Sequence, residues 1–357
     1  MKPLALFIVL RKNSKKELLF MLTHDLHEKI KQYISIYAEL KSKLKWKVSH
    51  DQILMLISSA YIVNKREFDF QRFYDLSSYI KSNIGSFSTL NSHHRFTVAS
   101  ILDIHFQHEA KQTFHTFIDV YNEMVKLGYK RDMFTYLSAL ILLTGKSETT
   151  NQKEQMNMGL AVYQQMKKNH YFLTSTQNVP LAVLLGENGE GLQALQKAET
   201  CYQLLAANGF KKGQYLHQVS HILALQSEKE PEMLVSACKQ IYQSITDVKK
   251  PKDYHYPDLA LLTFLEEPDI KTVLCITDEL NQEKAFKWQK EMNFKIAVSL
   301  YLSEHMEKNL LMESGLYTAI ETAIQAQQAA VLPSSAQQQP AIFMMETKGG
   351  ETCHTSH

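Results

Sequence analysis

Apolar residues recur at steps of three and four along most of this chain, with polar residues between them. In one segment the apolar positions are Phe114, Phe117, Tyr121 and Met124, and a more continuous apolar run follows over 137–143. Steps of three and four place side chains on one face of an α-helix, and a continuous run indicates a more deeply buried element. The pattern therefore predicts pairs of helices, the first amphipathic and the second buried.

This helix pair repeats with a period of about forty residues. Tyrosines occupy one equivalent position of the first helix in six segments, namely Tyr37, Tyr74, Tyr121, Tyr163, Tyr202 and Tyr242. Gly128 and Gly209 each follow a tyrosine of this series by seven residues, where a helix that ends in a left-handed conformation favours glycine. A helical pair covers its apolar face by stacking on its neighbours. We expect an all-α helical-hairpin repeat solenoid of about six units.

Changes in composition divide the chain into four parts. Residues 17–269 carry the repeat array, and further helical patterns over 270–328 are predicted to cap its last hairpin. Residues 1–16 form an N-terminal extension, and the Gln-, Ala-, Ser- and Gly-rich segment 329–357 is predicted to be disordered. The apolar run over 4–10 is too short to cross a bilayer, so we expect a cytoplasmic protein without a transmembrane segment.

Charge argues against a general nucleic-acid binder but leaves a local basic surface open. The chain has 39 Lys and Arg against 37 Asp and Glu, so its body is close to neutral. Basic pairs nevertheless recur at the turn between the two helices of a unit, and with Arg95 they are the candidate partner-binding residues: Lys130, Arg131, Lys211, Lys212, Lys249 and Lys250. These pairs either line a binding edge or simply complement the dipole at helix C-termini.

Candidate chemistry is limited to one histidine-rich segment. His94 and Asp103 bound it, and His105 and His108 have a spacing that places two metal ligands on one helix face. A turn is predicted near 107–111. The chain contains no nucleophile elbow, HExxH motif or dinucleotide fingerprint. We therefore assign no catalytic residue, expect no cofactor, and keep His105 and His108 only as candidates for a metal.

Two resemblances can be stated from these motifs. The segment YNEMVKLGYKRDMFTYL resembles a pentatricopeptide hairpin, and the units resemble tetratricopeptide hairpins in outline, but those families keep a period of about 34 or 35 residues. The segments KLKWKVSHDQILMLISSAYIVN, SHHRFTVASILD, YFLTSTQNVPLAVLL and HYPDLALL resemble an uncharacterised family of spore-forming Gram-positive bacteria, domain-of-unknown-function family 4003. This second resemblance covers roughly residues 30–328. It implies a soluble bacterial protein and brings no assigned activity.

Three functions remain open on this evidence. The first is a non-catalytic scaffold that binds a protein or peptide, because the repeats predict an extended surface without catalytic motifs. The second is binding of single-stranded RNA in a pentatricopeptide-like manner, which needs a constant register that this chain lacks. The third is an enzyme or metal-binding protein with a site near His94–Asp103.

Overall fold

The computed structural model describes the chain from residue 23 to residue 305 with short gaps. The described ranges are 23–48, 50–85, 88–145, 149–187, 190–247 and 251–305. All regular structure within them is helical, which confirms the predicted all-α class. No helix in these ranges is long and apolar enough to cross a membrane. The predicted extension 1–16 and tail 329–357 lie outside the described residues.

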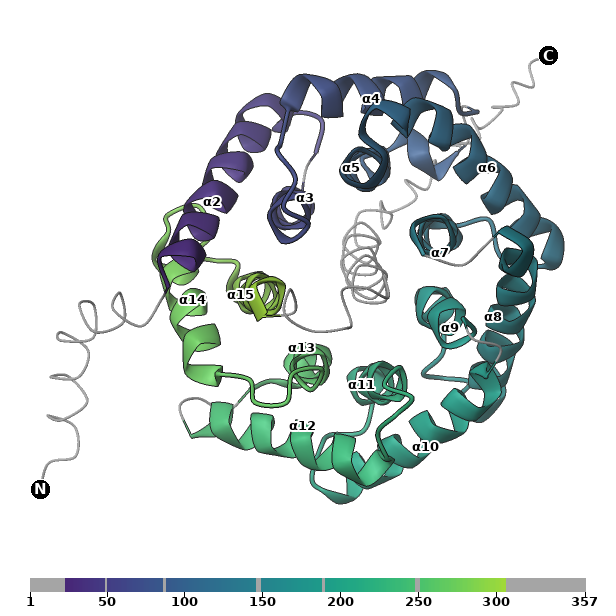
Figure 1. Cartoon of the computed structure of the whole chain (residues 1–357), viewed down its shortest axis with the longest axis vertical. Helices are drawn as coiled ribbons and strands as arrows, with labels where there is room; N and C mark the ends of the chain where they lie inside the picture. Colours follow the sequence, from purple (N-terminus) through teal and green to yellow (C-terminus); the bar gives the residue numbers. More distant parts are fainter. Residues whose placement is uncertain are drawn as a thin grey trace, which may run out of the picture.

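The helices form two concentric layers (Figure 1). The outer layer follows the circumference and consists of α2 (His24–Leu44), α4 (Phe70–Ser82), α6 (Ala110–Leu127), α8 (Thr149–Asn169), α10 (Gly191–Ala207), α12 (Pro231–Thr246) and α14 (Ile270–Gln282). The inner layer is seen end-on and consists of α3 (Asp51–Val63), α5 (His94–Phe106), α7 (Met133–Thr144), α9 (Val179–Leu185), α11 (Gln214–Ala224), α13 (Tyr256–Leu262) and α15 (Lys290–His305). Each outer helix and the inner helix that follows it make one hairpin.

The two layers have the sequence patterns that their surroundings require. Every residue of α3 from Ile53 to Val63 is buried, because this inner helix packs against both its outer partner and its inner neighbours. The outer helix α6 instead buries one stripe, which includes Phe114, Phe117 and Met124. Gly128 ends α6 with φ 111°, and the Asp132 side chain caps α7 by accepting from the Thr135 amide at 3.1 Å. The helix end at Gly128 matches the one predicted from the sequence.

The array closes into a ring. Helix α15 packs against α3 and α2, so the last described hairpin lies beside the first. The Lys29 ammonium lies 2.5 Å from the Glu304 carboxylate across this seam. The ring of Phe286 packs against Tyr33 at 5.4 Å and edge-on against Tyr37 at 4.7 Å between ring centroids. An open solenoid is therefore not confirmed. The described part of the segment predicted as a cap over 270–328 forms another outer–inner hairpin.

All inner helices run in the same direction, which gives the ring two distinct faces. The starts of α3 and α5 are neighbours, since the rings of His50 and His93 lie 6.1 Å apart. Their ends are also neighbours, since Tyr61 donates to Asp103 at 2.7 Å. We call the side where inner helices begin the start face. Its described segments are 45–48 with 50, 83–85 with 88–93, 128–132, 170–178, 208–213, 247 with 251–255, and 283–289.

The opposite side, where inner helices end, we call the end face. Gln226 at the end of α11 donates to Thr263 at the end of α13 at 2.8 Å, as the parallel arrangement requires. The described end-face segments are 64–69, 107–109, 145, 186–187 with 190, 225–230 and 263–269.

Candidate functional site

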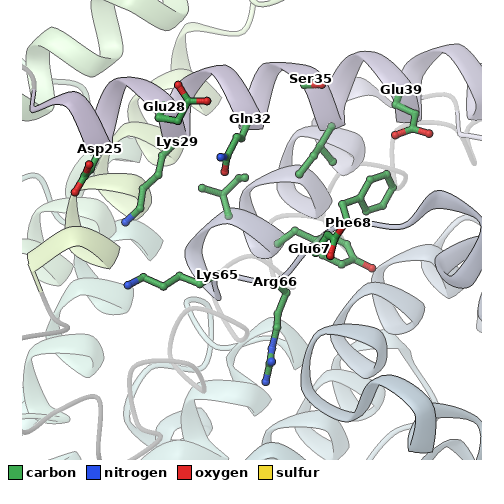
Figure 2. Close-up of a pocket in the computed structure, with 13 residues that line it drawn as sticks. Asp25, Glu28, Lys29, Gln32, Ser35, Glu39, Lys65, Arg66, Glu67 and Phe68 are labelled. Carbon is green, nitrogen blue, oxygen red and sulfur yellow. The ribbon is translucent and has the colours of Figure 1, made fainter.

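A pocket of about 660 Å³ opens at the end face between α2 and the end of α3. Its outer wall is a stripe along α2, and its inner wall is the α3 terminus with the connection to α4 (Figure 2). The stripe consists of Asp25, Glu28, Lys29, Gln32, Ser35, Ile36 and Glu39. Steps of three and four keep these side chains on one helix face. Because each helical residue rises 1.5 Å, the stripe is about 20 Å long.

The outer wall is predominantly acidic. Asp25, Glu28 and Glu39 contribute carboxylates to it, and its lysine, Lys29, is already engaged by Glu304 at 2.5 Å. Lys43 donates to Glu39 at 2.7 Å along the same helix. Exposed pairs of this kind contribute about 0.3–0.5 kcal/mol, so they do not prevent the carboxylates from binding a competing cation.

The inner wall carries basic groups. Lys65 and Arg66 project from the connection that follows α3, below the α2 stripe in Figure 2. Lys65 has a positive φ of 51°, which helps turn the chain sharply away from the helix end. Glu67 and Phe68 complete this wall. The pocket therefore places three carboxylates along α2 and two basic side chains, with Glu67 beside them, on the opposite wall.

A buried ionic cluster supports the inner wall. The Asp103 side chain is fully buried at the end of α5 and accepts hydrogen bonds from Tyr61 at 2.7 Å and from Arg72 Nε at 2.6 Å and Nη2 at 3.1 Å. The hydrogen bond to Asp103 raises the pKa of Arg72, and burial raises the pKa of Tyr61. Three helices, α3, α4 and α5, are thus joined beneath the pocket.

The predicted segment His94–Asp103 does not form a single site. His94 opens α5 at the start face and Asp103 lies near its other end, about 13 Å away at 1.5 Å per residue. Burial lowers the pKa of His94 to about 4. Arg95 is occupied locally, because its Nη1 donates to the carbonyls of Asn91 and Ser92 at 3.0 and 2.8 Å.

The two histidines considered as metal ligands, His105 and His108, lie in different surroundings. His105 lies within α5, where burial, followed by the charge of Arg66, lowers its pKa to about 4. His108 is exposed in the 3-10 turn η2 (Gln107–Glu109), which begins with the positive φ of Gln107. Among the described residues, no group of three or more His, Cys, Asp or Glu side chains is arranged to hold a metal ion.

Two of the predicted basic pairs, Lys130–Arg131 and Lys211–Lys212, lie in turns of the start face, as the sequence predicted. Lys130, Arg131 and Lys212 are exposed. Lys211 is exposed as well and pairs with Asp253 of the next hairpin at 2.8 Å. Lys249 and Lys250 lie outside the described residues. The two described pairs lie on the start face, whereas the inner wall of the pocket lies on the end face.

The sequence did not indicate a second buried polar cluster between α8, α10 and α11. His170 Nε2 lies 2.6 Å from the Glu199 carboxylate, and the ring of His217 packs 5.1 Å from His170 and 4.3 Å from His221. Burial, followed by the neighbouring histidines, lowers the pKa of His217 to about 2; burial lowers that of His221 to about 4. The available signal was the four-residue spacing of His217 and His221 within an apolar run.

A third polar cluster joins the starts of α13 and α15. Asp258 is 2% exposed, and its Oδ2 lies 3.9 Å from His255 Nδ1 without a hydrogen-bond partner among the described residues. Lys295 donates to Glu291 at 3.0 Å. Although burial opposes its charge, the pKa of Lys295 is raised by Asp258 and Glu291. This cluster holds adjacent inner helices together by charge.

Comparison with known proteins identifies the family. The model of the family described as "Protein of unknown function (DUF4003)" matches residues 36–329, and the chain belongs to this family. A protein of Bacillus subtilis (strain 168), "Uncharacterized protein YeaA", is 97% identical over 311 residues, which cover 87% of this chain and 94% of that protein. No solved structure matches the chain.

Proposed function

For this member of the DUF4003 family, we propose a non-catalytic role: the α2 pocket binds a polar protein segment that carries lysine or arginine side chains. The observation that carries the proposal is the acidic stripe along α2, with Asp25, Glu28 and Glu39 on one face of the helix. Carboxylates in a row attract a row of cations, and they recognise charge without requiring a reaction.

The dimensions of the pocket favour a chain segment. An extended peptide advances about 3.3–3.6 Å per residue, so about six residues follow the length of the stripe. Basic side chains at alternate positions would face the carboxylates of α2. Arg66, on the opposite wall, would accept an acidic side chain or a terminal carboxylate from the same segment. Such a ligand matches both walls.

The arrangement of the ring supports a scaffold more than the other two functions considered above. His94 and Asp103 lie at opposite ends of α5, so an enzyme site built from them has no geometric support. Binding of single-stranded RNA bases by the periodic tyrosines lacks support as well, because Tyr37, Tyr121 and Tyr202 are buried in the core. The basic turns of the start face are a separate surface.

We also infer that the hairpins are repeats of one unit. The six tyrosines of the periodic series all lie on outer helices, from Tyr37 on α2 to Tyr242 on α12. The resemblance to tetratricopeptide and pentatricopeptide hairpins concerns this shared outer–inner unit. Closure of the ring removes the open concave face that such arrays use, which directs attention to pockets at the faces.

Fluorescence anisotropy with two labelled synthetic peptides tests the proposed function. One peptide alternates lysine and serine, and the other, of equal length, alternates glutamate and serine. We expect the protein to bind the lysine peptide and not the glutamate peptide. Reversing two charges of the stripe, in Glu28→Lys/Glu39→Lys, should weaken binding about tenfold, since exposed charge pairs contribute about 0.2–1 kcal/mol each and reversal adds repulsion.

The matched control reverses an exposed acid far from the pocket. Glu154→Lys lies on α8, across the ring from α2, and it should leave the affinity unchanged within about twofold because rim charges away from an interface contribute little. The proposal is overturned if the lysine peptide does not bind, or if Glu154→Lys weakens binding as much as the double reversal does.

A further inference from the structure

Large aromatic side chains stand exposed on the start face. Trp46 is 89% exposed in the turn before α3, Trp288 is 85% exposed in the turn before α15, and Phe172 is 96% exposed in the turn before α9. Tyr171 is exposed beside Phe172. The chain contains two tryptophans in all, and both are here. Keeping several large aromatic side chains in water is unfavourable, so their common location indicates a partner.

The two tryptophan turns are built alike and are neighbours. Each contains a Lys-Trp pair, and in each the lysine ammonium lies 5.3 Å from the indole ring: Lys45 over Trp46 and Lys287 over Trp288. Closure of the ring brings the turns together, since Gln52 at the start of α3 donates to Gln289 at 3.2 Å. Both Lys-Trp pairs therefore lie in turns on the start face near the seam of the ring.

The two faces of the ring differ in charge. The described start-face segments contain nine Lys or Arg residues and four Asp or Glu residues. The described end-face segments contain three Lys or Arg residues and ten Asp or Glu residues. Outer helices end at the start face, so part of this polarity complements their dipoles. That explanation covers the lysines and gives no reason for exposed Trp and Phe.

We propose that the start face docks on an anionic lipid bilayer, with Trp46, Trp288 and Phe172 in the interfacial region. Trp and Tyr favour the headgroup level, and lysines near an anionic surface contribute about 1 kcal/mol each, or about fivefold in affinity. The acidic end face would be repelled from the same surface. The charge difference thus fixes one orientation, with the α2 pocket directed away from the lipid.

The distribution of the aromatics favours a membrane over single-stranded RNA. The tryptophans belong to the hairpins of α2 and α14, whereas Phe172 belongs to the hairpin of α8 on the opposite side of the ring (Figure 1). Contacts at opposite sides of a ring suit a flat surface. A strand of RNA is instead followed by successive aromatics along one basic groove.

Intrinsic fluorescence tests this proposal without a label, because both tryptophans report on the docking surface. Vesicles of phosphatidylcholine mixed with phosphatidylglycerol should shift the emission to shorter wavelength and sediment with the protein. Vesicles of phosphatidylcholine alone should do neither. In Lys45→Gln/Lys287→Gln, binding to the anionic vesicles should fall about 25-fold, at about fivefold for each lysine. In Trp46→Ala/Trp288→Ala, followed by sedimentation, it should fall at least tenfold.

The control removes exposed apolar side chains from the other side of the hairpins. Leu192 and Met233 are 51% and 61% exposed near the starts of α10 and α12, next to the end face. Leu192→Ala/Met233→Ala should bind anionic vesicles as the parent does. All changed side chains are largely exposed, so unaltered thermal unfolding will confirm that the fold is intact.

Three results would overturn the membrane proposal. The first is failure of anionic vesicles to sediment the parent protein, and the second is equal binding by the parent and the double tryptophan variant. The third is a poly-uridine oligonucleotide that binds the start face tightly and excludes the vesicles, which would assign this surface to RNA. The peptide experiment on the α2 pocket is independent, because none of the residues changed in the vesicle experiment lines that pocket.

Discussion

Two buried polar clusters in the ring differ in how their groups are satisfied. Around Asp103, a carboxylate accepts three hydrogen bonds from Tyr61 and Arg72. Around His217, both ring nitrogens are buried without a hydrogen-bond partner among the described residues, although His170 and His221 lie against the ring. Asp103 and His217 are thus both buried, but among the described residues only Asp103 has hydrogen-bond partners for its side chain.

Comparison of the two clusters therefore separates the effect of burial on stability from the effect of hydrogen bonding. A buried charge with all its partners holds several elements in one arrangement, and removal of one member leaves the others unsatisfied. A buried histidine without partners is held neutral by its surroundings, so it costs stability when protons are available. Mutation of the Asp103 cluster should therefore destabilise the protein, and protonation at low pH should destabilise it through the His217 cluster.

The largest expected effect comes from breaking the partnered cluster. Asp103→Ala leaves Tyr61 and the Arg72 guanidinium without their acceptor, and the free energy of unfolding should fall by about 3–5 kcal/mol. Urea unfolding followed by circular dichroism measures the loss. The control Asp119→Ala removes an exposed acid on α6 and should change stability by less than about 0.5 kcal/mol. Equal losses in both variants would remove the distinction.

Much of the local fold could be predicted from the sequence, because short-range periodicity and helix ends are encoded locally. The stripe containing Phe114 and Met124 and the helix end at Gly128 both occur as expected. The closed ring was missed. The seam joins residues more than 200 positions apart, such as Gln52 and Gln289, and periodicity within helices carries no information about such contacts.

The candidate site was harder to predict for the same reason. Asp103 was grouped with His94 because the two are near in sequence, yet the structure pairs it with Arg72 and Tyr61, 31 and 42 residues away. The acidic stripe of α2 was visible as polar positions three and four apart, but which stripe faces a pocket depends on the neighbouring connection 64–69. Only the tertiary arrangement supplies that neighbour.

Acid should destabilise the protein through the unpartnered cluster. The pKa of His217 is lowered to about 2 in the fold, while an unfolded histidine titrates near 6.5, so stability is unaffected above that pH and falls as pH decreases below it. Between pH 6.5 and 5 this histidine costs about 2 kcal/mol, at about 1.4 kcal/mol per pH unit.

Replacement of that histidine tests the explanation. His217→Leu should unfold like the parent protein within about 1 kcal/mol at pH 7.5 and exceed it by about 2 kcal/mol more at pH 5, measured by urea titration. The matched control His108→Leu changes an exposed histidine in η2 and should leave the pH dependence as it is. A His217→Leu variant with the parent's full acid sensitivity would show that the charge enters elsewhere.

Removal of a single hydrogen bond from the Asp103 cluster should have a smaller effect. Tyr61→Phe removes one of the three hydrogen bonds to Asp103 while keeping the ring, which packs edge-on against Phe68 at 4.9 Å. Stability should fall by about 1.5–3 kcal/mol, the usual contribution of a hydrogen bond to a charged group. A loss as large as that of Asp103→Ala would mean that Arg72 contributes nothing to the cluster.

The smallest expected effect lies at the seam of the ring, where a charge pair is only partly buried. The side chains of Lys29 and Glu304 are 14% and 24% exposed, so water still reaches both groups. In a double-mutant cycle with Lys29→Met and Glu304→Gln, the coupling energy should stay at or below about 1 kcal/mol. The aromatic contacts of Phe286 with Tyr33 and Tyr37 already hold the seam. A coupling energy of about 3 kcal/mol or more, as expected for the buried pair of Asp103 and Arg72, would show that closure of the ring depends on the ion pair. It would also show that a partly buried pair can stabilise the protein as much as a fully buried one.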